Sequence, residues 1–349
     1  MINVGEYIDL LCDLIATPSV SGSEAGVADL LQDWMSKRGL EVKRVANNIW
    51  VDSAPGSNAP VLLLNAHLDT VKPASSYTRD PFFPSVEGDC LYGLGSNDCG
   101  GSLVALLAAF RELSSRPQPY RLIFSATAGE ENCAPDGIEI FLPQIPLPAL
   151  GIIGEPTGMQ MAVAEKGLMV LDCTAHGITG HAAREEGVNA LYKALGDIEW
   201  FRTYSFPEVS DFLGAVKMTV TQIQCGTQHN VVPDKCSFVV DVRPNGEYSN
   251  EEILSVIREH VGCDVSPRSL KHQSSHIAQD HPVVKRGLGM GLKAFGSPTT
   301  SNQTRCAFPT LKIGPGESSR SHSADEYIKI SEIEQAVGVY IDLLDGLEI

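Results

Sequence analysis

Two histidines and three carboxylates follow separate apolar segments of this 349-residue chain, and their side chains suit metal binding. These five residues are His67, Asp98, Glu131, Glu155 and His322. In an open α/β sheet the carboxyl ends of the strands gather at one crevice, so residues that follow different strands can meet there. Imidazole and carboxylate donors suit zinc-like divalent ions, and one carboxylate could bridge two of them. The sequence therefore predicts a dinuclear metal site and hydrolysis assisted by metal ions.

Two further carboxylates could serve this site without binding metal. Glu130 directly precedes Glu131 after the apolar run RLIFSAT, so one glutamate of the pair can bind a cation while the other moves protons. Asp69 lies two residues after His67, where a carboxylate can orient a metal-binding imidazole.

Each of these residues also has an ordinary structural interpretation. His67 could be a satisfied buried histidine, and Asp98 could cap the helix that we expect from about Gly101. Glu155 and His322 could be solvated loop residues. The segment GLGSNDCGG is rich in glycine but lacks the ending of a phosphate-binding P-loop. The metal interpretation is favoured because all five residues occur together at matching strand ends.

The elements that must position these residues alternate between strand-like and helix-like patterns. This alternation predicts an α/β domain with a mostly parallel sheet, built from residues 1–164 and 277–349. The expected strands are 41–44, 49–51, 61–66, 121–127 and 310–313, and the expected helices are 3–15, 24–38, 101–113, 282–295 and 331–344.

Residues 165–276 have a different pattern and predict a separate, inserted domain. Strands at 168–175, 216–224, 236–243 and 264–271 alternate with helices at 188–202 and 250–261. The order β-α-β-β-α-β is that of a ferredoxin-like α+β unit. His322 must then come from beyond the insertion to complete the predicted site.

Composition limits the partners and the compartment. The chain has 43 acidic against 26 basic residues and a net charge of −17, which disfavours nucleic acid and anionic membranes as partners. Its first residues carry no basic segment of the kind that begins a signal peptide. Nine cysteines without C-x-x-C pairs argue against a disulfide framework, so we expect a cytoplasmic protein.

Several motifs together resemble one enzyme family. The segments HLDTVKP, GLGSNDCGG, GEEN, GEPT, GHAAR and the closing GPG-x5-H resemble the dinuclear-zinc peptidases and deacylases, over nearly the whole chain. This family includes acetylornithine deacetylase and succinyl-diaminopimelate desuccinylase. AEKGLMVLD and GTQHNVVPDKC look most like its N-acyl-ornithine and N-acyl-citrulline deacylase branch.

The resemblance implies a division of the metal ligands. His67 and Glu155 would bind one Zn²⁺, and Glu131 and His322 would bind the other, with Asp98 as the bridge. Co²⁺ could substitute for zinc.

The resemblance also implies roles in catalysis and assembly. Glu130 would act as general base and acid, and Asp69 would orient His67. His181 resembles a lid histidine that reaches the partner's site in dimeric members and steadies the oxyanion. The inserted domain would thus be a lid that also mediates a homodimer. A cis peptide bond between Asp98 and Cys99 is implied as well.

Four residues would hold the substrate carboxylate by the same resemblance. Asn230 and Arg243 are the main candidates, and Arg184 and Thr304 are weaker ones. Arginine suits this task because its planar group can pair with a carboxylate through two hydrogen bonds. SNQTR, at residues 301–305, departs from the glycine-rich stretch of the diaminopimelate enzymes.

The expected activity is removal of an acetyl or succinyl group from the α-nitrogen of ornithine or citrulline, in arginine biosynthesis. A succinyl-diaminopimelate desuccinylase or a dipeptidase of the same fold is the nearest alternative. A non-catalytic binding protein would be expected to lack some of the ligands, and a thiol enzyme using Cys99 would need a histidine base beside it.

Overall fold

The computed structural model describes residues 3–349. Contacts divide the chain into two compact units, which we call the first and the second unit. The first unit contains the chain up to Val163 together with His276–Phe295 and Ser301–Ile349, and the second contains Ala164–Ser275 and Gly296–Thr300. The sequence placed residues 296–300 in the first domain. They cluster with the second unit instead, where the Lys166 amide donates to the Ser297 carbonyl at 3.1 Å.

A mostly parallel sheet forms the centre of the first unit, as predicted. The strand order is β1-β2-β6-β3-β7-β17-β8-β15, with β16 beside β8. The central strands β6, β3, β7 and β17 pair in parallel, whereas β1, β2 and β8 pair antiparallel. Their bounds are β1 Lys43–Val45, β2 Asn48–Asp52, β3 Val61–His67, β6 Arg121–Thr127, β7 Leu150–Ile153, β8 Met161–Glu165, β15 Ser275–His276, β16 Ala294–Ser297 and β17 Thr310–Lys312.

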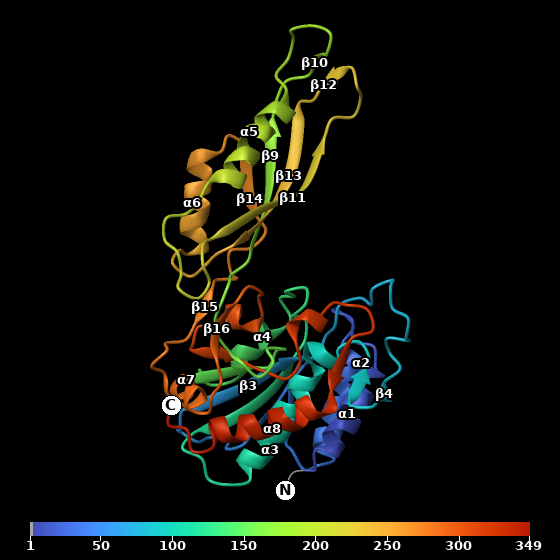
Figure 1. Ribbon diagram of the computed structural model, residues 1–349, viewed down its shortest axis with the longest axis vertical. Coiled ribbons are helices and arrows are strands. Elements are labelled where there is room, and N and C mark those ends of the chain that lie inside the picture. Colours follow the sequence, from blue (N-terminus) through green and yellow to red (C-terminus); the bar gives the residue numbers. More distant parts are fainter. Residues whose placement is uncertain (1–2) are drawn as a thin grey trace. The chain divides into compact units, whose positions relative to one another are not determined.

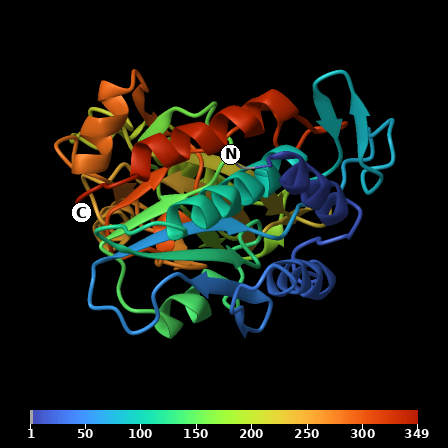
Figure 2. The same ribbon diagram turned by 90° about the horizontal axis from the view of Figure 1, so that it is seen from below.

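Strands β3 and β6 are buried along their whole length because helices cover both faces of this sheet. In Figure 2, α3 and α8 lie side by side on one face and α4 lies on the other. Ile138 and Phe141 of α4 pack on Trp50, Leu63 and Ile123 of the sheet. The helices are α1 Gly5–Ile15, α2 Ala25–Ser36, α3 Gly101–Ser114, α4 Ile138–Phe141, α7 Pro282–Gly289 and α8 Ile330–Leu344.

The helix expected at 282–295 is shorter than predicted. It ends at Gly289, and residues 294–297 form strand β16. Glycine has a low helix propensity, and Gly291 adopts a left-handed conformation with φ of +86°. A small sheet of β4 (Ser85–Glu87), β5 (Cys90–Tyr92) and β18 (Tyr327–Lys329) was also not predicted.

The second unit has the predicted ferredoxin-like order β-α-β-β-α-β. Its antiparallel sheet has the order β11-β13-β9-β14, and α5 and α6 pack on one face of it (Figure 1). Residues that alternate along β9 and β13 fill the core, as expected for strands with one covered face. The elements are β9 Met169–His176, β10 Gly180–His181, α5 Ala190–Thr203, β11 Lys217–Cys225, β12 Val231–Val232, β13 Lys235–Arg243, α6 Asn250–His260 and β14 Asp264–Pro267.

Within residues 3–349, none of the helices has the length and apolar character needed to cross a lipid bilayer.

Candidate metal centre

The five predicted metal ligands all lie in the first unit, at the carboxyl ends of its strands or in adjoining loops. His67 is the last residue of β3, Glu131 follows β6 and Glu155 follows β7. Asp98 lies in the segment Ser96–Gly100 that leads into α3, and His322 lies in the loop before β18. Because β6, β3 and β7 are parallel neighbours, their carboxyl ends bring these side chains to one edge of the sheet.

Asp98 lies between the two histidines. His67 Nε2 is 3.1 Å from Asp98 Oδ1, and His322 Nε2 is 3.7 Å from Asp98 Oδ2. His67 Nε2 also lies 3.9 Å from Glu155 Oε1, and His322 Nε2 lies 2.9 Å from Glu131 Oε2. Each oxygen of Asp98 thus faces a different histidine, which is the arrangement that a bridging carboxylate requires.

The backbone around Asp98 excludes the helix-cap interpretation. Gly100 directly precedes the first turn of α3, and Asp98 has the extended values φ −120° and ψ 96°. The Asp98–Cys99 peptide bond is cis, which confirms that prediction.

The donor set fits two divalent cations. Donor atoms of Asp98, Glu131 and His322 lie within 4.8 Å of one another. On the other side of Asp98, His67 Nε2 lies 3.1 Å from an Asp98 oxygen and 3.9 Å from a Glu155 oxygen. Imidazole nitrogen and carboxylate oxygen are ordinary ligands of zinc and similar ions. Several carboxylates crowded around two imidazoles also need positive charge to neutralise them.

Asp69 does more than the sequence predicted. His67 Nδ1 lies 2.8 Å from the backbone carbonyl of Asp69 and 3.6 Å from its carboxylate Oδ1. The carboxylate also accepts the amide protons of Glu130 at 3.0 Å and Glu131 at 3.1 Å, and the Ser21 hydroxyl at 2.7 Å. Asp69 therefore contacts the imidazole through its backbone carbonyl and, at longer range, its carboxylate, and the carboxylate in addition fixes the turn that carries both glutamates.

Burial and neighbouring charges shift the pKa values of Glu130 and His322. Burial raises the pKa of Glu130 to about 8, and the neighbouring charges of Glu131, Asp98 and Asp69 act in the same direction. A hydrogen bond to Glu131 raises the pKa of His322 to about 9. Cations bound among these carboxylates would lower both values, because they favour the charged carboxylate and the neutral imidazole.

Cys99 does not have the character of a reactive thiol. Burial raises its pKa to about 12, although His67 acts in the opposite direction. The His67 amide donates to the Cys99 sulfur at 3.2 Å, so the thiol packs against the strand end that carries His67. This neutral, buried sulfur argues against the thiol-enzyme interpretation.

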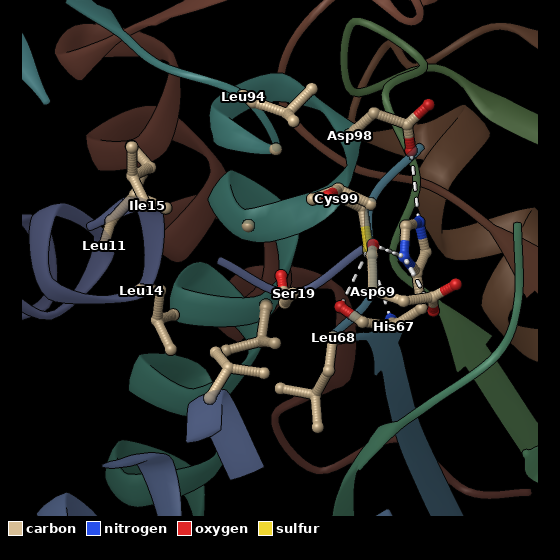
Figure 3. Close-up of a pocket in the computed structure, with 15 residues that line it drawn as sticks. Leu11, Leu14, Ile15, Ser19, His67, Leu68, Asp69, Leu94, Asp98 and Cys99 are labelled. Atoms are coloured by element: carbon tan, nitrogen blue, oxygen red, sulfur yellow. Dashed lines mark hydrogen bonds and ion pairs between the residues drawn. The ribbon is translucent and has the colours of Figure 1, made fainter. Parts of the chain in front are cut away.

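A small cavity lies behind the donors, toward α1. Figure 3 shows Leu11, Leu14 and Ile15 across this cavity from His67, which lies between Asp98 and Asp69. Its volume of about 20 Å³ has room for roughly one water molecule.

Four of the other predicted site residues lie in the second unit, at two different places. His181 pairs with Val231 across the β10–β12 ladder, and the Ala182 amide donates to the Asn230 carbonyl at 3.0 Å. Arg184 follows in the same exposed loop. Arg243 ends β13, where its guanidinium donates to Asp241 at 2.7 and 3.0 Å.

Thr304 lies in the first unit and faces inward. It is 7% exposed, and its hydroxyl donates to the Ser301 carbonyl at 3.0 Å. Two residues earlier, the side-chain Nδ2 of Asn302 donates to Asn65 Oδ1 and to Thr127 Oγ1, at 3.1 Å each. This loop is therefore anchored below the strand ends, and the hydroxyl of Thr304 stabilises its own turn.

Two residues that adjoin the metal centre were not identified from the sequence. Asn97 is completely buried, and Glu326 is 2% exposed with its carboxylate at the backbone of Asp98. The signals available were weak: Asn97 is the neighbour of a predicted ligand, and Glu326 is an acidic residue shortly after His322.

Comparison with known proteins agrees with the geometry. Residues 63–346 match the family described as peptidase family M20/M25/M40. A succinyl-diaminopimelate desuccinylase of Xanthomonas campestris is 27% identical, with 98% of this chain and 99% of that protein covered. A protein of Pyrobaculum aerophilum named as a LysW-lysine/LysW-ornithine hydrolase is 30% identical, with 96% and 94% covered. An acetylornithine deacetylase of Proteus mirabilis is 26% identical, with 95% and 94% covered.

Solved structures show the same fold. A tripeptidase of Staphylococcus aureus superposes with a TM-score of 0.79 at 19% identity, covering 99% of this chain and 98% of that one. A dinuclear metal-binding M20 peptidase of Bacillus subtilis superposes with a TM-score of 0.72 at 13% identity, covering 97% of each chain.

Proposed function

Because the chain belongs to peptidase family M20/M25/M40, we propose that it is a zinc-dependent amide hydrolase acting on N-acyl-ornithine or N-acyl-citrulline. It would remove an acetyl or succinyl group from the α-nitrogen and release the free amino acid for arginine synthesis in the cytoplasm. The observation that carries this proposal is the position of Asp98 between His67 and His322, with Glu130 beside the cluster. Relatives named as a deacetylase and a desuccinylase support the substrate class.

We assign the metal ligands as the sequence predicted. His67 and Glu155 would hold one cation, Glu131 and His322 the other, and Asp98 would bridge them. When bound, the two ions would supply Lewis acidity toward the amide carbonyl and the attacking water.

Glu130 would carry the proton. It would take a proton from the attacking water and later give it to the leaving amine. Its neighbour Glu131 cannot do this while it binds metal, because its lone pairs are then engaged. Asp69 would help the two glutamates to keep separate roles. Its carboxylate accepts the backbone amide protons of both Glu130 and Glu131, and so fixes the direction in which each side chain leaves the turn.

The spacing within the second unit supports a homodimer in which His181 serves the partner's site. Strand β13 runs from Lys235, shortly after β12 of the β10–β12 ladder, to Arg243 at its other end. Eight residue steps of a strand span roughly 26 Å. His181 and Arg243 of one chain are therefore too far apart to contact one small substrate.

Exposed apolar residues of the second unit offer a surface for this dimer. Tyr192 and Leu195 on α5 are 72% and 50% exposed, and Ile223 on the edge strand β11 is 48% exposed. An edge strand has unpaired backbone groups that a second copy could pair with. Mixing inactive His181→Ala chains with inactive Glu130→Ala chains should restore activity in hybrid dimers. Proven subunit exchange without recovery would show that His181 does not act across the dimer.

A substrate panel tests the proposed activity directly. The purified protein with added zinc or cobalt would be assayed for free amine released from N-acetyl- and N-succinyl-ornithine and N-acetyl- and N-succinyl-citrulline. Succinyl-diaminopimelate and unblocked dipeptides would serve as comparison substrates. We expect the blocked ornithine or citrulline compounds to be preferred. Preference for a dipeptide with a free α-amino group would instead identify a peptidase, and preference for succinyl-diaminopimelate a desuccinylase.

A further inference from the structure

The loops that carry Asp98 and His322 are held together by residues that do not themselves reach the metal centre. Glu326 Oε1 accepts the backbone amide protons of both Asn97 and Asp98, at 2.8 and 2.9 Å. Glu326 follows His322 by four residues, whereas Asp98 is more than two hundred residues away in the sequence. One buried carboxylate therefore ties the backbone of the bridging residue to the His322 loop.

The Asn97 side chain makes the complementary connection. Its Nδ2 donates to the Glu317 carbonyl at 3.1 Å and to the Ser321 hydroxyl at 3.2 Å. Its Oδ1 accepts the Glu317 amide proton at 3.0 Å. The side-chain amide of Asn97 thus bonds both the carbonyl and the N–H of Glu317, as the backbone of a neighbouring strand would.

The loop comes so close to Asn97 that only glycine fits opposite it. A Cβ atom on Gly316 would lie 2.2 Å from Asn97 Oδ1, and Gly316 has φ of +84°. Both the space and the backbone conformation therefore require glycine. This close approach lets the Asn97 amide reach the Glu317 backbone.

We infer that Asn97 and Glu326 are positioning residues that set the distance between Asp98 and His322, and hence the affinity of the cation site formed by Asp98, Glu131 and His322. This inference rests on the proposed metal-binding roles of Asp98 and His322. His67 is the last residue of β3 and Glu155 lies two residues after β7, and both strands are buried, so the sheet itself positions these two ligands. His322 lies in a loop, and its place relative to Asp98 depends on the Asn97 and Glu326 contacts.

The consequence is unequal for the two cation sites. Loss of either positioning residue should weaken the site that needs His322 more than the site of His67 and Glu155. Hydrogen-bond partners of metal ligands typically change metal affinity about tenfold to a hundredfold when they are removed. A role in folding alone would lower the melting temperature without separating the two affinities.

The test is calorimetric titration of Zn²⁺ into chelator-treated protein, for the wild type, Glu326→Ala, Glu326→Gln and Asn97→Ala. In Glu326→Ala and Asn97→Ala we expect about tenfold to hundredfold weaker binding at one of the two sites, with a smaller change at the other. Glu326→Gln should recover most of the loss, because its amide oxygen can still accept both protons. If the alanine variants fail to fold, Asn97→Asp provides the comparison, because it keeps the oxygen that accepts the Glu317 amide proton and loses the Nδ2 donor to Glu317 and Ser321.

Asp325→Asn is the matched control. Asp325 accepts the Thr78 and Arg79 amide protons at 2.9 and 3.0 Å, and its replacement removes a charge one residue from Glu326. It should leave both zinc affinities unchanged. The inference is wrong if both affinities in folded Glu326→Ala equal those of the wild type, if both fall equally, or if Asp325→Asn weakens binding as much as Glu326→Ala does. Because zinc binding is measured without substrate, a wild type that binds two ions but hydrolyses no N-acyl amino acid would contradict only the proposed function.

Discussion

The two units differ in how they present their predicted functional residues. In the first unit, His67 and Asp69 are 3% and 1% exposed and are fixed by contacts with their neighbours. In the second unit, His181 and Asn230 are exposed residues at the small two-stranded sheet of β10 and β12. Fixed distances are what the proposed chemistry requires of the buried group. The exposed side chains are accessible to a substrate or a second chain, as their proposed role in recognition requires.

The largest expected effect comes from removing the proton carrier of the buried group. Glu130→Gln should lower kcat by about 10²- to 10⁴-fold, the usual contribution of general acid–base catalysis. Two metal equivalents should remain, because Glu130 is not assigned as a ligand. Glu131→Gln is the matched control and should lose metal. Rate assays beside metal analysis check both variants, and loss of one full equivalent from Glu130→Gln would make that residue a ligand.

A smaller effect is expected from the recognition side. Arg243→Ala should lower kcat/KM about tenfold to a hundredfold, because a hydrogen bond to a charged group contributes roughly 1.5–3 kcal/mol. Arg243→Lys should recover only part, since the forked geometry is lost. Metal content should not change.

Arg268 provides the control for this variant. It forms a similar two-bond pair with Asp172 in the second unit, at 2.9 and 2.8 Å. Arg268→Ala should leave kcat/KM unchanged in a steady-state assay. If Arg243→Ala lowers only thermal stability, its pair with Asp241 is structural and Arg243 does not bind substrate.

The smallest effect on activity is expected at the opposite end of the sheet from the metal centre. Burial would raise the pKa of Asp52, but hydrogen bonds and the charge of Arg121 hold it below its usual value. The Arg121 Nε donates to Asp52 Oδ1 at 2.9 Å, and Nη2 contacts Oδ2. A carboxyl whose pKa is lower in the folded state stabilises the fold above its unfolded pKa of about 4, and this is lost as the pH falls through the folded pKa.

Asp52→Asn should therefore reduce the free energy of unfolding at pH 7 by about 3 kcal/mol, because it leaves a buried arginine without its partner. It should also flatten the fall in stability below about pH 4. Denaturant titrations at several pH values measure both effects. The activity of the folded variant should stay at the wild-type level. If the free energy of unfolding falls equally steeply with decreasing pH in both proteins, this role for Asp52 is contradicted.

The same contrast explains what the sequence could predict. The positions of His67 and Glu155 follow from buried strands that end in a polar residue, which is a local pattern. Glu326 and Asn97 escaped notice because their partners come from distant segments. The helix expected at 282–295 was too long because its apolar spacing continues past glycines that end it. His181, Asn230 and Arg243 were assigned by resemblance alone, and the loop of Thr304 turned inward because Asn302 anchors it to Asn65.

Metal stoichiometry tests the central claim, that Asp98 bridges two cations at the strand ends, most directly. Chelator-treated wild type, Asp98→Ala and Glu155→Ala would be titrated with Zn²⁺ by calorimetry. We predict two equivalents for the wild type, weakened binding at both sites in Asp98→Ala, and loss of mainly one equivalent in Glu155→Ala. Identical losses of a single equivalent in both variants would contradict the bridging role of Asp98.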